Sequence, residues 1–187
     1  MTSPLRVLAL SGSLRKSSYN SALLRAAQQL APAGVTVELF DLRPIPMYDD
    51  DLRTGGWPEP VAQLRSAIAA ADALLIGTPE YNYSLPAVLK NALDWASRAP
   101  DAPLAGKPAA IMSATLGNLG GIRAQVHLRQ VLVGTGSLAV NRPEVAISRV
   151  QERFDASLAL TDEPTRTLIA GLLVSLAAWT LQLRSHG

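Results

Sequence analysis

The strongest constraint on the fold of this chain is a regular alternation between two kinds of segment. Short apolar or alternating runs predict buried strands at residues 6–10, 35–40, 73–77 and 108–114. Apolar residues at three- and four-residue intervals predict helices at residues 19–31, 61–71, 85–98 and 122–132. Strands that alternate with helices in this way are typical of a parallel sheet covered by helices on both faces.

The C-terminal part of the sequence predicts a fifth strand and a long helix. Residues 138–148 predict the final strand, which an Arg-Pro pair interrupts, and residues 149–160 fit either a short helix or an extended segment. Thr161 resembles the N-cap of the last helix, because two acidic residues and a proline follow it. That helix is apolar on most sides from Leu168 to Leu183, so we expect it to pack on the sheet and to touch a partner subunit.

Five strands within 187 residues predict one α/β domain that spans residues 1–187. They fit a flavodoxin-like, doubly wound, five-stranded parallel sheet of order 2-1-3-4-5, in which a ligand lies at the carboxyl ends of strands 1, 3 and 4. Residues 41–60 are rich in Pro, Gly and Asp and predict a long loop that is functional or part of an interface.

Composition excludes several kinds of chemistry. The chain has no cysteine, which removes disulfides, thiolate nucleophiles and cysteine-based metal sites, and its two histidines, His127 and His186, lie far apart, so no metal site is expected. The net charge is +2 and the cations are scattered, so we expect no nucleic-acid partner. No signal peptide and no run of about 18 uncharged apolar residues is visible, so we expect a cytoplasmic protein that does not bind a membrane.

The loop after the first strand carries the clearest functional signal. Residues 11–20 combine several hydroxyls, one side-chain amide and the guanidinium of Arg15 at the start of a helix. A helix start offers free backbone N–H groups and the positive end of the helix dipole, which together suit a phosphate dianion. The alternative is a serine-rich turn with an ordinary N-cap. The loop has neither the glycine and lysine spacing of a P-loop nor a dinucleotide-binding fingerprint.

Two further loops follow strands 3 and 4. Residues 78–86 have a proline near each end and include Tyr81 and Tyr83, so this stiff loop can present backbone groups and a ring to a flat heterocycle. Residues 113–121 contain Gly117, Gly120 and Gly121, and glycine permits close backbone approach to such a ligand. Each loop alone fits a structural turn equally well. Phosphate at the first loop and a planar ring between the other two describe a mononucleotide, and FMN is the one usual in this architecture.

The three loops resemble signatures of the NADPH-dependent FMN reductase family, which includes quinone, chromate and azo-dye reductases. The residues concerned are the first loop, the second loop with the helical segment Leu89–Trp95, and the segment from Gly120 to Arg129. The likeness covers roughly residues 5–150. It implies FMN as the cofactor, NADPH or NADH as co-substrate, a small-molecule electron acceptor, and a homodimer or homotetramer.

The resemblance also implies roles for individual residues. One set would hold the FMN phosphate: Ser13, Arg15, Ser18 and Asn20, with Ser21 as a further cofactor-binding candidate. A second set would line the flavin ring: Pro79, Glu80, Tyr81 and Asn82. A third set would close the other side of the ring: Ser113, Leu116 and Gly117. No catalytic side chain is expected, because the flavin carries the chemistry while the protein binds and orients the reactants.

The expected reaction is a ping-pong hydride transfer from NAD(P)H through FMN to acceptors such as quinones, free flavin, azo dyes or chromate. A non-enzymatic electron carrier of the flavodoxin type is the alternative, although such carriers tend to be acidic and this chain is slightly basic. A receiver-like signalling module is less consistent with the sequence, because Ser11-Gly12-Ser13 and Thr78-Pro79-Glu80 stand where acidic residues and a phosphoacceptor Asp are needed.

Overall fold

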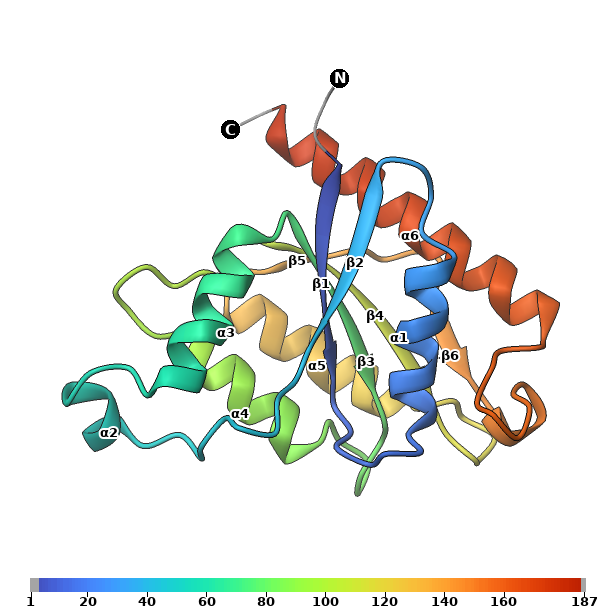
Figure 1. The fold of residues 1–187 in the computed structure, drawn as a ribbon, viewed down its shortest axis with the longest axis horizontal. Coiled ribbons are helices and arrows are strands. Elements are labelled where there is room, and N and C mark those ends of the chain that lie inside the picture. The colour runs from blue at the N-terminus through green and yellow to red at the C-terminus, as the bar shows by residue number, and fades with distance from the viewer. Residues whose placement is uncertain (1–3, 186–187) are drawn as a thin grey trace.

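The protein is built around one parallel sheet, which the computed structural model describes within residues 4–185. Its main path runs β2 (Val35–Phe40), β1 (Leu5–Ser11), β3 (Ala73–Thr78), β4 (Pro108–Ala114) and β5 (Leu138–Ala139), with every pairing parallel (Figure 1). This confirms the flavodoxin-like order 2-1-3-4-5. His186, which we expect to take no part in a metal site, lies outside the described residues.

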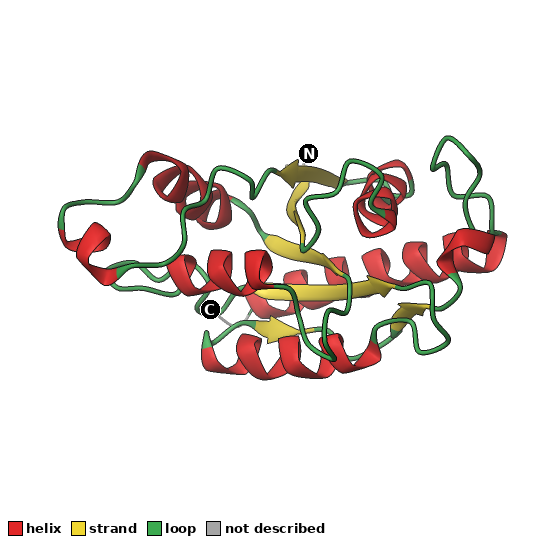
Figure 2. Cartoon of the chain, turned by 90° about the horizontal axis from the view of Figure 1, so that it is seen from below, coloured by secondary structure: helices red, strands yellow, loops and turns green. Residues whose placement is uncertain are grey.

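Helices cover both faces of the sheet, as Figures 1 and 2 show. One face packs on α1 (Tyr19–Gln29) and α6 (Glu163–Arg184), and the other on α3 (Glu59–Ala70), α4 (Ala87–Ala96) and α5 (Ile122–Gly134). Successive strand residues point to opposite faces. In β1, therefore, Val7 and Ala9 join one apolar cluster while Leu8 and Leu10 join the other.

The expected fifth strand is two short strands and not one. β5 pairs with the start of β4, whereas β6 (Val145–Ile147) pairs with its end, at Met112–Ala114. Val140 still donates to the Ala109 carbonyl of β4, and residues 141–144 leave the sheet. Pro143 lies in this gap, and proline has no N–H to donate to a strand ladder, which explains the interruption.

Two connecting segments contain short helices. The expected loop at 41–60 includes α2 (Asp50–Thr54), whose N-cap Asp49 accepts a hydrogen bond from the Asp51 N–H. The ambiguous segment 149–160 begins with a 3₁₀ turn, Val150–Glu152, and continues into a hairpin in which Phe154 pairs with Leu160.

The long last helix starts one residue later than expected. Its N-cap is Asp162 and not Thr161, because the Asp162 carboxylate accepts from both the N–H and the hydroxyl of Thr165. By length and composition alone α6 could cross a membrane. Here Ile169, Leu172 and Leu173 are buried in the cluster on the sheet, so this face of α6 packs on the domain.

Candidate functional site

The three loops singled out in the sequence meet at one edge of the sheet. In the parallel register Ser11 lies beside Gly77, and Thr78 lies beside Ser113. The carboxyl ends of β1, β3 and β4 are therefore level, and the loops that leave them lie together at the lower edge in Figure 1. This edge is where doubly wound sheets bind their ligands.

These loops enclose a cavity of about 290 Å³. The first loop and the start of α1 form one wall, and the second and third loops form the others. Eight of the twelve residues predicted from the sequence line this cavity: Ser13, Arg15, Ser18, Asn20, Pro79, Glu80, Tyr81 and Leu116. The other four, Ser21, Asn82, Ser113 and Gly117, are not in its lining.

The first loop offers hydrogen-bond donors that the protein itself does not use. Ser18 is the N-cap of α1 and accepts from the Ser21 N–H, whereas no described residue accepts from the N–H groups of Tyr19 or Asn20. The Arg15 guanidinium likewise has no hydrogen-bond or ion-pair partner within residues 4–185. A guanidinium, hydroxyls and free N–H groups at a helix start together fit the phosphate of a mononucleotide.

Asn20 and Ser21 have structural contacts that the sequence did not reveal. The Asn20 amide is buried and bonds both backbone groups of Ala114, donating from Nδ2 at 3.0 Å and accepting at Oδ1 at 2.9 Å. The pair of bonds ties α1 to the end of β4. The Ser21 hydroxyl lies 2.8 Å from the Ser11 hydroxyl, outside the cavity. Asn20 therefore borders the cavity with its amide already satisfied.

The second loop is a tight turn that packs against the first. Tyr81 and Ser84 exchange two backbone hydrogen bonds of 3.0 Å, and Asn82 and Tyr83 between them both have positive φ, at 49° and 65°. This geometry is the two-residue hairpin turn that asparagine tolerates well. It carries Asn82 away from the cavity and leaves the Tyr81 ring half exposed at its rim.

Glu80 connects the second loop to α5. Its Oε2 accepts from the N–H groups of Arg123 and Ala124 at 3.1 and 3.4 Å, and its Oε1 lies 3.3 Å from the Arg123 guanidinium. The N-cap of α5 is Gly121, which has no side chain to fill this role. Glu80 thus caps a helix 43 residues further along the chain while it lines the cavity.

The third loop contributes fewer of its predicted residues. Leu116 lines the cavity, but Ser113 is fully buried, donates to the Gly120 carbonyl and accepts from Gln125 at 2.7 Å. The carbonyl of Gly117 accepts from the Arg149 N–H at 3.0 Å, which fixes the loop to the segment that follows β6.

Four further lining residues were not among the candidates. Tyr19, Ala114 and Thr115 lie within the loops already considered, so their position next to the candidates was the available signal. Val150 comes from the ambiguous segment 149–160 and gave no signal at all. The hairpin after it places Phe154 5.4 Å from Tyr19, between ring centroids, and so supports this wall of the cavity.

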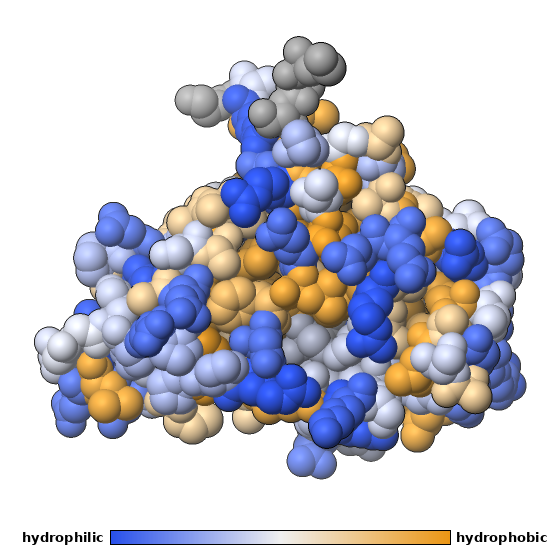
Figure 3. All heavy atoms as spheres, viewed as in Figure 1, coloured by the Kyte–Doolittle hydropathy of each residue, from blue (hydrophilic) through white to orange (hydrophobic). Residues whose placement is uncertain are grey.

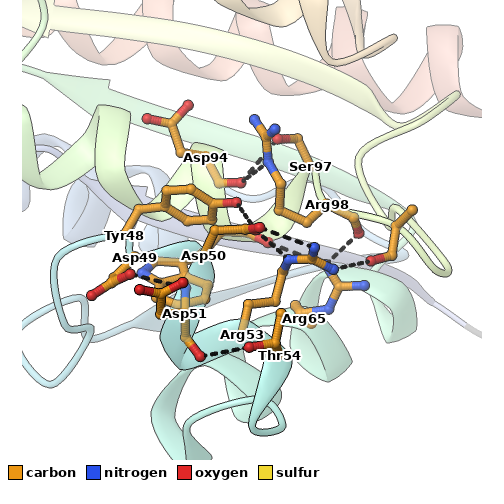
Figure 4. Close-up of polar contacts among 12 residues, drawn as sticks. Tyr48, Asp49, Asp50, Asp51, Arg53, Thr54, Arg65, Asp94, Ser97 and Arg98 are labelled. Atoms are coloured by element: carbon orange, nitrogen blue, oxygen red, sulfur yellow. Dashed lines mark hydrogen bonds and ion pairs between the residues drawn. The ribbon is translucent and has the colours of Figure 1, made fainter.

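The helical signature in α4 has its main partners away from the cavity. Asn91 donates to the Pro46 carbonyl at 2.7 Å and accepts from the Tyr48 N–H, and Trp95 also donates to Pro46. Figure 4 shows the neighbouring contacts, in which Asp50 binds the Tyr48 hydroxyl at 2.8 Å and Arg53 at 2.6 Å. The signature therefore fixes the loop before α3, and no residue of that loop lines the cavity.

Arg65 stabilises the end of α4 in the same region. It is buried and donates to carbonyls that follow the helix, including that of Arg98 at 2.9 Å, and its guanidinium lies 3.9 Å from the centroid of a Trp57 ring. Burial lowers its pKa. These contacts are structural.

A second cavity, of about 340 Å³, lies at the opposite edge of the sheet. Its charged groups bind one another or the backbone: Arg184 pairs with Asp72, and the Lys107 ammonium donates to the Ala71 carbonyl at 2.6 Å. Burial lowers the pKa of Lys107. This cavity is remote from the carboxyl edge.

Within residues 4–185 no group of three or more His, Asp or Glu side chains could hold a metal ion.

Comparison with known proteins agrees with this geometry. Residues 5–152 match the model of the family described as NADPH-dependent FMN reductase. The chain is 50% identical to an NAD(P)H-dependent FMN reductase of Pseudomonas aeruginosa, over 98% of this chain and 100% of that protein. It is 46% identical to an NADPH:quinone oxidoreductase of Arabidopsis thaliana, over 96% and 94% of the two chains.

A solved structure also aligns along nearly the whole chain. The flavoenzyme NAD(P)H:(acceptor) oxidoreductase FerB of Paracoccus denitrificans superposes with a TM-score of 0.87 at 35% identity, over 95% of this chain and 98% of that one. Fold and site define a flavin-dependent oxidoreductase of the flavodoxin-like class. The chain belongs to the NADPH-dependent FMN reductase family, with FMN as cofactor and NAD(P)H as co-substrate.

Proposed function

We propose that this protein reduces quinones with electrons from NAD(P)H, using FMN held in the 290 Å³ cavity. The observation that carries the proposal is the division of that cavity into two chemical halves. One half offers Arg15 and the free N–H groups at the start of α1, and the other offers Tyr81 and Leu116. The name of the Arabidopsis relative, an NADPH:quinone oxidoreductase, supports the same activity.

The polar half suits the phosphate end of the cofactor. Ser13, Arg15 and Ser18 would hold the phosphate, together with the N–H groups of Tyr19 and Asn20. A hydrogen bond to a charged group contributes about 1.5–3 kcal/mol, so a few such bonds suffice for tight retention. The Asn20 amide supports this wall from behind through Ala114, and Ser21 does so through Ser11.

The less polar half suits a flat ring. Pro79, Tyr81, Thr115 and Leu116 would flank the ring, and the Glu80 contacts with α5 hold the second loop in place. FMN supplies, when bound, hydride transfer from NAD(P)H and then reduction of a quinone to its hydroquinone. The residues of the chain bind and orient the reactants. We propose that Asn82, Ser113 and Gly117 shape the second and third loops.

The test is the visible absorption spectrum of the purified protein, recorded before and after NADPH is added without oxygen. We expect flavin bands that bleach with NADPH and return when a quinone is added, with hydroquinone as the product. Bands that bleach with neither NADPH nor NADH would show an electron carrier. A protein that binds no flavin after incubation with FMN would contradict the assignment of the cavity.

The phosphate assignment has its own variant. Arg15→Ala should weaken FMN binding about tenfold, because one charge-assisted contact is lost. The ratio of flavin to protein absorbance after gel filtration measures this loss. Arg142→Ala is the matched control, since Arg142 is strongly exposed and pairs with Glu144. Wild-type flavin retention in Arg15→Ala would refute the assignment.

We also infer that residues 1–187 form one FMN-binding domain, that the enzyme is cytoplasmic, and that it assembles as a homodimer or homotetramer. Support for assembly comes from Val126 and Val133, which lie seven residues apart on α5 and are 59% and 71% exposed. Apolar side chains of this kind are often covered in oligomers. Light scattering on the purified protein measures the mass, and a monomer at all concentrations would contradict this inference.

A further inference from the structure

A second pocket lies on the other side of the first loop from the FMN cavity. It has a volume of about 270 Å³ and is bordered by the first loop, by α1 and by the residues that follow β2. Figure 3 shows hydrophilic side chains gathered on this face around α1 and the lower part of β2. Ser13 and Arg15 line both the pocket and the cavity, so the two are separated only by this loop.

The pocket is strongly basic. Its lining contains four cationic side chains, those of Arg15, Lys16, Arg25 and Arg43. Asp41 is the one carboxylate in the lining. Asp41 is already bound to Arg43, at 3.2 Å. Arg43 also donates to the Leu14 carbonyl at 2.8 Å, which fixes the first loop.

The other three cations have no partner within the described part of the chain. Neither a hydrogen bond nor an ion pair engages the side chains of Arg15, Lys16 or Arg25. Arg25 lies one helical turn beyond Ser21 on the same face of α1, and both residues line the pocket. Arg15 is assigned to the FMN phosphate, so Lys16 and Arg25 are the cations left without a counter-charge, and a bound anion relieves the repulsion between them.

We propose that this pocket binds the 2′-phosphate of NADPH and makes the enzyme favour NADPH over NADH. The inference rests on the proposed function, since it concerns the coenzyme of the same reaction. NADPH differs from NADH only by this phosphate, which carries close to two negative charges at neutral pH. Arginine is suited to recognise such a group because its guanidinium can bind two phosphate oxygens at once.

The pocket is next to the cavity that holds FMN. The nicotinamide end of the coenzyme must reach that FMN in order to react with it. Because FMN occupies the cavity, the nicotinamide has to stack on the flavin ring, and the rest of the coenzyme has to extend past one of the surrounding loops. The first loop is the one with unpaired cations on its far side. The cations are exposed, so screening by salt should weaken the contact as ionic strength rises.

The test variant is Arg25→Gln, because Arg25 lines the pocket and not the FMN cavity. Its KM for NADPH divided by its KM for NADH should rise about threefold to tenfold relative to wild type, which corresponds to the loss of one partly screened ionic contact. Lys16→Gln should shift the ratio in the same direction. Arg142→Gln removes an exposed arginine elsewhere and should leave the ratio unchanged.

A binding measurement makes the test independent of turnover. In the FMN-loaded wild type, 2′,5′-ADP should raise the unfolding temperature more than 5′-AMP does, and this difference should shrink in Arg25→Gln but not in Arg142→Gln. If neither NADPH nor NADH is oxidised, the proposed function fails, while the nucleotide difference still reports on the pocket.

Two results would overturn the proposal. An unchanged KM ratio in both Arg25→Gln and Lys16→Gln would show that the pocket does not contact the 2′-phosphate. Equal stabilisation by 2′,5′-ADP and 5′-AMP, with an Arg25-dependent stabilisation by inorganic phosphate, would show a site for the free anion and not for the coenzyme.

Discussion

The contact between Glu80 and α5 predicts how the second loop is held in place. Glu80→Gln keeps the shape of the side chain but removes the charge that faces Arg123 and the first turn of α5. The Glu80 side chain is only 12% exposed, whereas that of Arg123 is 43% exposed, so the ion pair itself is partly screened. Two charge-assisted bonds to backbone N–H groups at a helix start account for most of the effect.

We expect Glu80→Gln to lower the free energy of unfolding by about 1–2 kcal/mol, since an amide oxygen still accepts one of these bonds, more weakly. Urea unfolding measures this change as a lower midpoint with an unchanged slope. FMN affinity should fall as well, because the loop that Glu80 fixes lines the cavity.

The matched control is Glu152→Gln, which breaks an exposed ion pair with Arg149 of 3.9 Å. It should change the free energy of unfolding by less than about 0.5 kcal/mol. A double-mutant cycle of Glu80→Gln with Arg123→Gln separates the ion pair from the helix cap. If Glu80→Gln is no more destabilising than Glu152→Gln, the proposed capping role is refuted.

Three other substitutions test further features by urea unfolding. Asn20→Ala should cost about 2–4 kcal/mol, because it leaves both backbone groups of Ala114 unpaired in the interior; a loss under 1 kcal/mol would contradict this. Gly120→Ala should cost more than about 2 kcal/mol, since φ is +60° and a Cβ would lie 2.6 Å from β6 backbone atoms, whereas Gly134→Ala, which meets nothing within 4 Å, should be neutral. Hydrogen bonds, chiefly from the Thr165 hydroxyl, lower the pKa of Asp162 below its ordinary 3.8. The contribution of Asp162 to the free energy of unfolding is therefore complete above pH 3.8 and is lost as pH falls through the lower folded pKa. Asp162→Asn should make the free energy of unfolding depend less steeply on pH in this acid range. An equal slope in both proteins would refute this prediction.

Much of this protein could be read from the sequence because the relevant signals are local. The periodicity of apolar residues determined the order of strands and helices, and handedness and burial then leave few ways to assemble them. The ends of strands 1, 3 and 4 predicted where the ligand site lies, and eight candidate residues do line the cavity found there. Arg15 and Ser18 could be proposed as phosphate ligands because a phosphate site at a helix start needs only neighbours in sequence.

Only the tertiary structure decided what several polar side chains do. The Asn20 amide is used by Ala114, 94 residues away, and the Glu80 carboxylate caps a helix 43 residues away. Val150 reaches the cavity because a hairpin folds back beside α1. The basic pocket likewise joins α1 to residues after β2. A buried hydrogen bond or a cluster of cations from separate segments depends on which segments meet in space. Local sequence patterns carry no information about such distant partners.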